Sequence, residues 1–267
     1  MDISGATKII GFCGSSFASS RIYDVYNNAF RALELDYVYV PFQAKTAQDA
    51  AHGLWSLNLH GIGVTIPFKS TIVPYLDEMS AEAARTGAVN VVMNQDGKLV
   101  GGNTDGLGAL SALEESVTLS GGEKILILGA GGAARAIAAA LTLRGYVPTV
   151  SSLRQNEAAS LGSDIGVPIA QWENRHHEVE AANIIINATP VGMEGSGLET
   201  QTPFDTGSLP PAATVMDIVA SPINTPLTQQ ARAAGCTVVA GDRMQKWQAF
   251  LKFEIYTGVK PPADLFL

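Results

Sequence analysis

The sequence predicts an α/β protein with an N-terminal α/β domain, a doubly wound α/β domain after it, and a C-terminal helix that returns to the first domain. Short apolar runs of strand length alternate with stretches of helical period, which is typical of mainly parallel sheets. A glycine-rich turn in mid-chain joins an apolar strand to an alanine-rich helix. With 267 residues, 46% of them hydrophobic and 16% charged, the chain can bury more than one core.

The first elements form a small α/β unit. A strand is predicted over residues 8–13, and Ser20 is a plausible N-cap for the helix after it. In that helix apolar side chains recur on one face, at Ile22, Val25, Tyr26, Ala29, Phe30 and Leu33. A second strand over 37–41, a helix over 46–57 and a third strand over 61–67, which a proline ends, complete the unit.

The second domain is predicted to begin where the composition turns glycine-rich, near residue 106. Its buried strands are expected over 124–128, 148–151, 183–188, 214–218 and 237–240. The first domain therefore covers residues 1–106 and the second 107–241. The amphipathic stretch 244–256 is interpreted as the returning helix, within a segment 242–267 that completes the first domain.

The amino-acid composition limits the classes of partner that the protein is expected to bind. There are 17 Lys and Arg against 25 Asp and Glu, a net charge of −8 with no basic cluster, which disfavours nucleic acid and an anionic membrane surface. No run approaches the roughly 20 apolar residues of a membrane helix, and the N-terminus does not resemble a signal peptide, so a cytoplasmic location is expected. Cys13 and Cys236 have neither disulfide nor zinc-site spacing and are expected to be inert core thiols, and no metal is expected.

The glycine-rich turn predicts a dinucleotide site. Gly129, Gly131 and Ala134 match the pattern G-x-G-x-x-G/A, in which glycines allow a tight turn and let a helix N-terminus approach a pyrophosphate. The turn follows a strand, opens a helix and precedes a second strand, the context of a Rossmann-type NAD(P)-binding domain. The plainer interpretation is an ordinary strand–helix turn.

The second strand of that domain favours NADP over NAD. An NAD-binding protein usually carries Asp or Glu at the end of this strand to hold the ribose hydroxyls, whereas here the strand ends at Ser151 and is followed by Arg154. Hydroxyl groups and a guanidinium suit a 2′-phosphate, because Arg offers bidentate donors to phosphate oxygens. Alternatively, Arg154 is a solvated surface residue.

Two polar residues in apolar surroundings are candidates for the chemistry. Lys69 follows the third strand, and Asp105 lies in the run GNTDG at 102–106. Loops after strands are where α/β folds place ligands, and a Lys–Asp pair can hold a substrate hydroxyl and pass its proton during oxidation. The alternatives are a solvated lysine and an aspartate in a turn.

Six motifs in order resemble the shikimate/quinate dehydrogenase family, from about residue 9 to residue 262. They are GVTIPFK at 63–69, GAVN at 87–90, GNTDG at 102–106, GAGGAARA at 129–136, NATPVGM at 187–193 and TPL at 225–227. The resemblance implies two domains with the substrate in the cleft between them. It also implies hydride transfer between NADP and a shikimate-like carboxylate, in the shikimate pathway of aromatic biosynthesis.

The resemblance also implies residue roles. Lys69 and Asp105 match the catalytic pair beside the hydroxyl being oxidised. Thr65, Asn90 and Gln248 match residues that contact the substrate. Cofactor contacts are implied for Gly129, Gly131, Gly132, Ala133, Ser151 and Arg154, and positions near the nicotinamide for Thr189, Met193, Gly241 and Met244.

Two departures concern the substrate. The family's His-Ser-x-Ser-Pro segment, whose serines bind the substrate carboxylate, is absent, and Ser19, Ser20 or Arg21 at a helix N-terminus are the candidates to replace it. Ala220 stands where the family usually has a substrate-contacting tyrosine. The chain therefore looks like a shikimate dehydrogenase-like paralogue that acts on shikimate weakly or prefers a related polyol acid.

Two other functions stay open. One is an NAD-linked quinate dehydrogenase, against which the missing acidic residue after Val150 argues. The other is a dinucleotide-binding regulator that has lost turnover, against which Lys69, Asp105, Asn90 and Gln248 argue. A monomer or a homodimer is expected.

Overall fold

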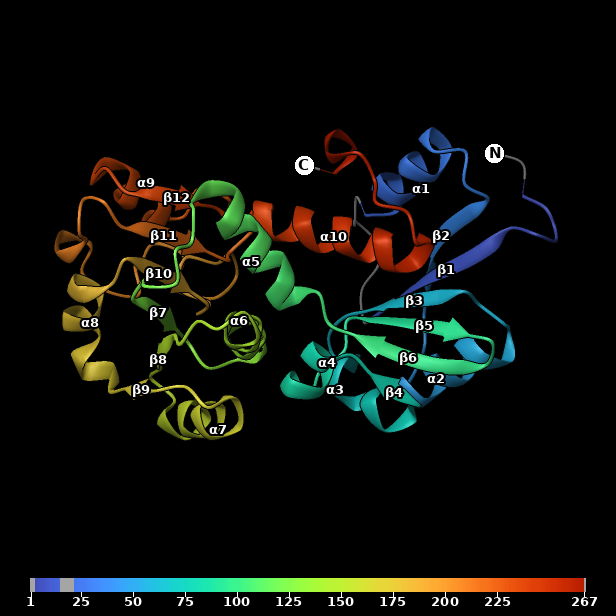
Figure 1. Cartoon of the computed structure of the whole chain (residues 1–267), viewed down its shortest axis with the longest axis horizontal. Coiled ribbons are helices and arrows are strands. Elements are labelled where there is room, and N and C mark those ends of the chain that lie inside the picture. Colours follow the sequence, from blue (N-terminus) through green and yellow to red (C-terminus); the bar gives the residue numbers. More distant parts are fainter. Residues whose placement is uncertain (1–2, 15–21, 267) are drawn as a thin grey trace. The chain divides into compact units, whose positions relative to one another are not determined.

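The computed structural model describes residues 3–14 and 22–266. The chain divides into two compact units. Unit 1 contains the chain up to Thr104 together with the segment from Gln248 onward, and unit 2 contains Asp105–Trp247. Each unit is built on its own sheet (Figure 1). The predicted α/β class, with a C-terminal helix that returns to the first unit, is confirmed.

The sheet of unit 1 has six strands and is mixed. Its order is β2 (Tyr37–Phe42), β1 (Lys8–Cys13), β3 (Gly61–Val64), β5 (Val91–Gln95), β6 (Lys98–Gly102) and β4 (Glu78–Met79). Strand β1 is parallel to β2 and β3, whereas β5 is antiparallel to both β3 and β6. Since β4 is parallel to β6, β5 is the one described strand of this sheet that runs against the others, and the expected mainly parallel pattern holds.

The sequence reasoning missed the β5–β6 hairpin. Its turn contains Asp96 and Gly97, which both have positive φ, of 53° and 92°. An Asp-Gly turn of this kind matches the twist of two antiparallel strands, and it was the local signal available. The third strand was also predicted too long, because β3 ends at Val64 and residues 65–67 lead into a short helix.

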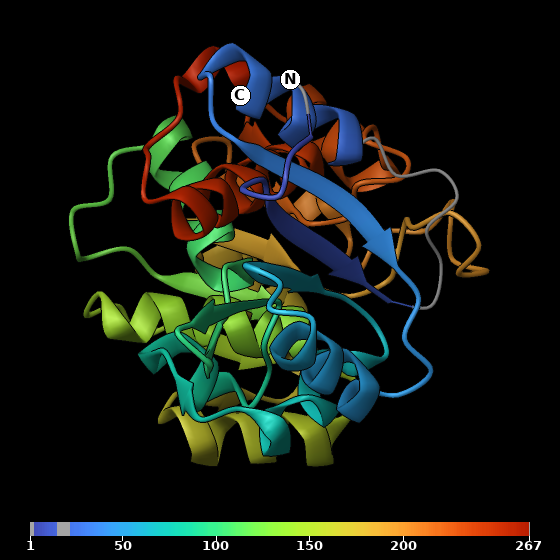
Figure 2. The ribbon, with the colours of Figure 1, turned by 90° about the vertical axis from the view of Figure 1, so that its right-hand side faces the viewer.

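Helices cover both faces of the unit 1 sheet (Figures 1 and 2). One face carries α2 (Ala47–Ser56), α3 (Phe68–Thr71) and α4 (Ala81–Thr86) over an aliphatic core that includes Leu54, Ile62 and Val64. The other carries α1 (Ile22–Ala32) and the end of α10 (Gly241–Thr257) over stacked aromatic rings. Tyr26 packs at 4.4 Å from Tyr39 and at 6.4 Å from Phe253, measured between ring centroids.

Unit 2 has six parallel strands in the order of a doubly wound domain. The order is β12 (Thr237–Val239), β11 (Thr214–Asp217), β10 (Ile184–Asn187), β7 (Ile125–Leu128), β8 (Thr149–Ser151) and β9 (Ile169–Ala170). The helices are α5 (Asp105–Ser116), α6 (Gly132–Leu143), α7 (Gln155–Ile165), α8 (Arg175–Ala181), α9 (Pro226–Ala233) and the first part of α10. The order reverses between β7 and β10, the switch point at which such sheets bind ligands.

Helix α5 packs closely against α6 through one glycine. An ideal Cβ on Gly106 would lie 2.1 Å from the carbonyl oxygen of Ala136, so any other side chain at this position requires the helices to separate. Asp105, which the sequence allowed to be a turn residue, is instead the first residue of α5.

Both cysteines are free thiols in buried positions. Burial raises the pKa of the Cys13 thiol to about 11 and raises that of the Cys236 thiol as well.

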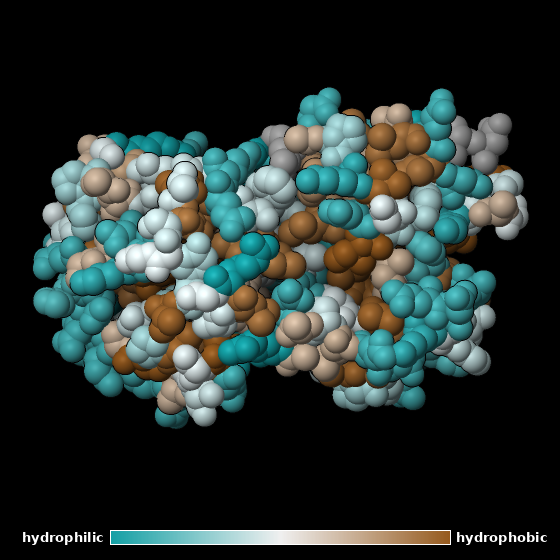
Figure 3. Space-filling view, viewed as in Figure 1, coloured by the Kyte–Doolittle hydropathy of each residue, from teal (hydrophilic) through white to brown (hydrophobic). Residues whose placement is uncertain are grey.

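None of the helices in the described parts of the chain is long and apolar enough to cross a membrane. On the face shown in Figure 3, apolar patches lie among hydrophilic side chains.

Candidate active site

Lys69 lies in the short helix α3, immediately after the loop that leaves strand β3. Its side chain is half-buried. The neighbouring Phe68 is buried in the core under α2, and the backbone N–H of Val89 donates to the Lys69 carbonyl oxygen at 2.8 Å. These two contacts fix the backbone at Lys69 from both sides, so the lysine side chain leaves the end of the sheet from an anchored position.

Asn90 connects this strand end with the segment that leads to Asp105. It is fully buried, and its carbonyl oxygen accepts from the backbone N–H of Val64 at 2.9 Å. Its Nδ2 donates to the Thr104 hydroxyl at 3.1 Å, and the Thr104 backbone N–H donates to the Asn90 Oδ1 at 3.0 Å. Asp105 follows Thr104 directly in the chain and is 8% exposed.

Sequence reasoning did not single out two residues of this arrangement. Thr104 pairs with Asn90, and Asn103 Nδ2 donates to the Ala88 carbonyl oxygen at 2.9 Å. Both are buried, which places the GNTDG motif inside unit 1 up to its aspartate. The signal available was the position of Asn103 and Thr104 within that motif.

The other expected substrate contacts differ in what surrounds them. Thr65 is half-buried beside Gly14, where an ideal Cβ would lie 2.2 Å from the Thr65 Cγ2. Gln248 is half-buried on α10 and belongs to unit 1. The expected carboxylate-binding residues Ser19 and Ser20 lie outside the described residues, as does the predicted cap at Ser20.

The glycine-rich turn in unit 2 has the geometry of a phosphate-binding turn. Gly129 has φ of 110°, and an ideal Cβ there would lie 2.7 Å from the Ala188 carbonyl oxygen, so the position requires glycine. Gly131 caps α6 and Gly132 begins it, and an ideal Cβ on either would meet nothing within 4 Å. Ala133 is half-buried in the first turn. Exposed amides at the start of this 12-residue helix fit the phosphates of a dinucleotide.

The end of strand β8 has no acidic residue, and its serine and arginine lie in different surroundings. Ser151 is fully buried, and its hydroxyl has no hydrogen-bond partner within the part of the chain that the structure describes. Arg154 is 76% exposed and forms an ion pair with Glu157 at 3.0 Å. The Arg154 guanidinium is therefore available at the surface of unit 2, held by one neighbouring carboxylate.

A buried polar network supports the loop after strand β10. The Thr189 hydroxyl donates to Asn187 Oδ1 at 2.6 Å, and Asn187 Nδ2 donates to Asp217 Oδ1 at 3.0 Å. The Thr225 hydroxyl donates to Asp217 Oδ2 at 2.6 Å. Burial raises the pKa of the Asp217 carboxyl, while the hydrogen bonds that it accepts favour its charged form. The network joins β10, β11 and the N-cap of α9.

The remaining expected nicotinamide neighbours are placed differently from one another. Met193 is 41% exposed, whereas Met244 is 5% exposed and belongs to the hydrophobic core of unit 2. Gly241 begins α10, and an ideal Cβ there would lie 2.3 Å from the Val219 carbonyl oxygen. Gly241 thus permits a close backbone approach.

The described residues bring together no group of three or more His, Cys, Asp or Glu side chains that could hold a metal ion.

Known proteins resemble the chain over nearly its whole length. A model of the shikimate dehydrogenase substrate-binding domain matches residues 12–92. Two proteins named shikimate dehydrogenase (NADP(+)) are similar: that of Pyrococcus furiosus is 37% identical over 98% of this chain and 95% of its own, and that of Citrifermentans bemidjiense is 38% identical over 98% and 94%. The structure of shikimate 5-dehydrogenase from Listeria monocytogenes, in complex with shikimate and NAD, has a TM-score of 0.93 and 34% identity, covering 100% of this chain and 97% of that one.

Proposed function

Because this chain belongs to the shikimate dehydrogenase family, we propose that it interconverts shikimate, or a closely related cyclic hydroxy acid, and its 3-dehydro ketone with NADP. In this proposal unit 1 binds the substrate and unit 2 binds the dinucleotide. The observation that carries it is the buried pairing of Asn90 with Thr104, which ties the strand end before Lys69 to the residue before Asp105.

Lys69 and Asp105 are proposed as the acid–base pair. In the oxidation direction the C–H bond at the hydroxyl carbon breaks, and its electron pair leaves as hydride. The proton of the same hydroxyl passes to the Lys69–Asp105 pair, so a C=O bond forms without a charged oxygen intermediate. NADP, when bound, supplies the nicotinamide ring that accepts or returns the hydride.

Thr65, Asn90 and Gln248 are proposed to hold substrate hydroxyls, and Ser19 and Ser20 to bind the carboxylate. The Asn90 side chain is rigid because both of its polar atoms bond to Thr104. A preoriented amide loses little freedom when a ligand binds, which favours it as an orienting group.

Gly129, Gly131, Gly132 and Ala133 are proposed to contact the dinucleotide phosphates. Thr189, Met193, Gly241 and Met244 are proposed to lie near the nicotinamide. Since Met244 is buried in the core, its role would be to support the wall of that site.

We expect Arg154→Ala to raise the KM for NADP about tenfold and the KM for NAD by less than twofold. The guanidinium of Arg154 is exposed, and a charge-assisted bond to the 2′-phosphate exists with NADP alone. Steady-state kinetics with both cofactors measure the effect, and Arg144→Ala, at another exposed arginine, is the control. Equal effects on both cofactors would make Arg154 a bystander.

We expect Ala220→Tyr to improve kcat/KM for shikimate by about fivefold. Ala220 is half-buried after β11, and a phenol there restores one hydrogen-bond donor, whose usual net contribution is about 0.5–1.5 kcal/mol. Comparing shikimate with quinate separates a gain in one substrate from a general change. No change for either substrate would place the specificity elsewhere.

The experiment that tests the function is a four-way assay of nicotinamide absorbance. Purified protein is mixed with shikimate or quinate, each with NADP⁺ or NAD⁺. Reduction with shikimate and NADP⁺ supports the proposal, whereas reduction with quinate and NAD⁺ favours the quinate enzyme. The Listeria relative, whose structure contains NAD, is a reason to run both cofactors. Silence in all four, with thermal-shift evidence of NADP binding, favours a different cyclic acid as substrate or the regulator.

We further propose a cytoplasmic location, a monomeric or homodimeric state, and no nucleic-acid partner. The last of these proposals rests on the net charge of −8, and the small-molecule chemistry proposed here fits a cytoplasmic enzyme.

A further inference from the structure

Unit 1 contains a pocket that the proposed chemistry does not use. It lies between α2 and the ends of strands β1, β2 and β3, and its volume is about 400 Å³. Cavities of this size hold small organic ligands. Thr65, Lys69, Asn90 and Gln248 are not among the residues that line it.

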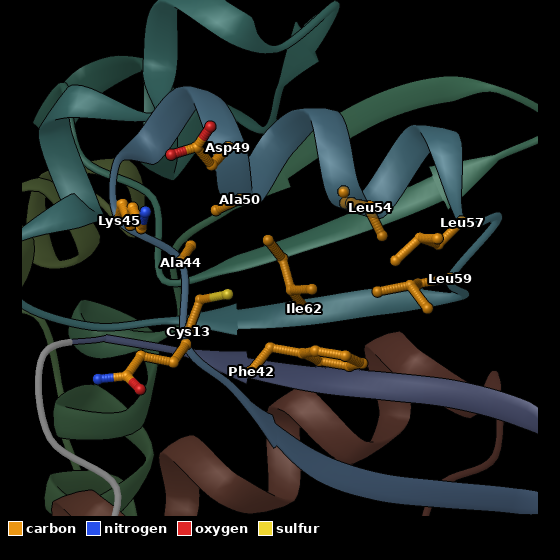
Figure 4. Close-up of a pocket in the computed structure, with 12 residues that line it drawn as sticks. Cys13, Phe42, Ala44, Lys45, Asp49, Ala50, Leu54, Leu57, Leu59 and Ile62 are labelled. Carbon is orange, nitrogen blue, oxygen red and sulfur yellow. The ribbon is translucent and has the colours of Figure 1, made fainter.

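The pocket has a polar end and an apolar end (Figure 4). Lys45 and Asp49 lie at one end, near the start of α2, and Leu57 and Leu59 lie at the other. Ile62 lies between the two ends, on the wall formed by β3. Leu57 is 66% exposed although it is a large apolar side chain, so the apolar end lacks a cover among the described residues.

The two charged groups at the polar end are not equivalent. One oxygen of the Asp49 carboxylate accepts from the backbone N–H of Thr46 at 3.1 Å and from its hydroxyl at 2.8 Å, which completes a capping box at the start of α2. Lys45 is exposed and has no ion-pair partner among the described residues. The Lys45 ammonium is therefore the charge available to a ligand.

We propose that this pocket binds a small carboxylic acid with an apolar ring or chain, outside the substrate site. The carboxylate would pair with Lys45 beside the N-terminus of α2, and the apolar part would lie against Leu54, Leu57 and Leu59. An uncharged ligand would gain no attraction from Lys45, and a larger polar ligand would lose water without hydrogen-bond partners at the leucine end. The proposal goes beyond the proposed function and does not depend on it.

Gly53 offers a way to close the pocket without damaging the fold. It lines the pocket from within α2, and an ideal Cβ on it would meet nothing within 4 Å. Replacing a helical glycine with leucine raises helix propensity, so Gly53→Leu is expected to fill space without loss of stability. Gly53→Ala, which adds a single methyl group, is the matched control.

In the test, the full chain is titrated with 3-phenylpropionate or with its neutral amide. Ligand-observed NMR measures the binding of each probe. We expect the acid to bind with a Kd on the order of 1 mM and the amide to bind about fivefold more weakly. Lys45→Met should weaken the acid about fivefold and leave the amide unchanged, whereas Lys260→Met should change neither. Gly53→Leu should weaken the binding of both probes at least about tenfold, and Gly53→Ala should leave the binding of both unchanged.

Four outcomes would overturn the proposal. Equal binding of acid and amide would remove the carboxylate from the ligand class. Binding that survives Gly53→Leu would place the probe elsewhere, and loss of binding in Lys69→Ala would place it in the substrate site. Absence of binding by either probe up to about tenfold above the expected Kd would contradict the site itself. Because the readout is binding, inactivity toward shikimate or quinate leaves these outcomes unaffected.

Discussion

Lys69→Ala is expected to lower kcat by about 10²- to 10⁴-fold while NADP binding persists. General acid–base groups contribute a factor of this size, and Lys69 belongs to unit 1, whereas the glycine-rich turn belongs to unit 2. The substitution should therefore remove proton transfer without changing the Kd of the dinucleotide. Steady-state kinetics and a fluorescence titration with NADPH measure the two quantities separately.

The control for this substitution is Lys98→Ala. Lys98 is an exposed lysine of unit 1 whose ammonium pairs with Glu78, and an exposed ion pair contributes little to stability. Its kcat should stay within about twofold of the unchanged protein. An unchanged kcat in Lys69→Ala would contradict the catalytic assignment, and a weakened NADP complex would point to a structural effect instead.

Gly106→Ala is expected to destabilise unit 2 by about 2–3 kcal/mol. The added Cβ would lie 2.1 Å from the Ala136 carbonyl oxygen and 2.8 Å from the Ala140 Cβ, and backbone cannot move aside as a flexible side chain does. Thermal unfolding followed by circular dichroism should show a lower midpoint. Since α5 begins at Asp105, turnover should fall in the same variant.

Gly53→Ala is the matched control, because it is also a glycine in a helix. An ideal Cβ at Gly53 meets nothing within 4 Å, so the variant should gain about 0.5–1 kcal/mol from the lower backbone entropy of the unfolded chain. Opposite signs at the two glycines are the expected result. A stable Gly106→Ala protein would mean that α5 and α6 can separate at little cost.

More of the strands of unit 2 than of unit 1 could be predicted from the sequence. Its four-residue strands are fully buried and mostly apolar, such as residues 125–128 and 184–187, because a parallel sheet is buried on both faces. Unit 1 changes from parallel to antiparallel pairing at β5, and its last strands are short and partly exposed. A two-residue strand such as β4 carries too few side chains to show a period.

The candidate site also has a part that could be predicted from the sequence and a part that only the structure shows. Lys69, Asp105 and the turn at Gly129 follow strand ends in the sequence, so their presence at ligand-binding edges could be inferred without the structure. The partners of those segments could not. Thr104 bonds to a side chain 14 residues away, and nothing in the sequence between them indicates that pairing.

What the sequence by itself determined are the local features: the strand runs, the glycine at position 129 with its positive φ, and the polar residues that follow strands. These features depend on neighbours within a few residues, so the hydrophobic period and the local residue types are enough to predict them. The tertiary structure alone decided the pairing of Asn90 with Thr104, the approach of Gly106 to Ala136 and the pocket beside α2. Each of these depends on the packing of segments that are distant in the chain, and close packing is a property of the assembled core rather than of any one segment.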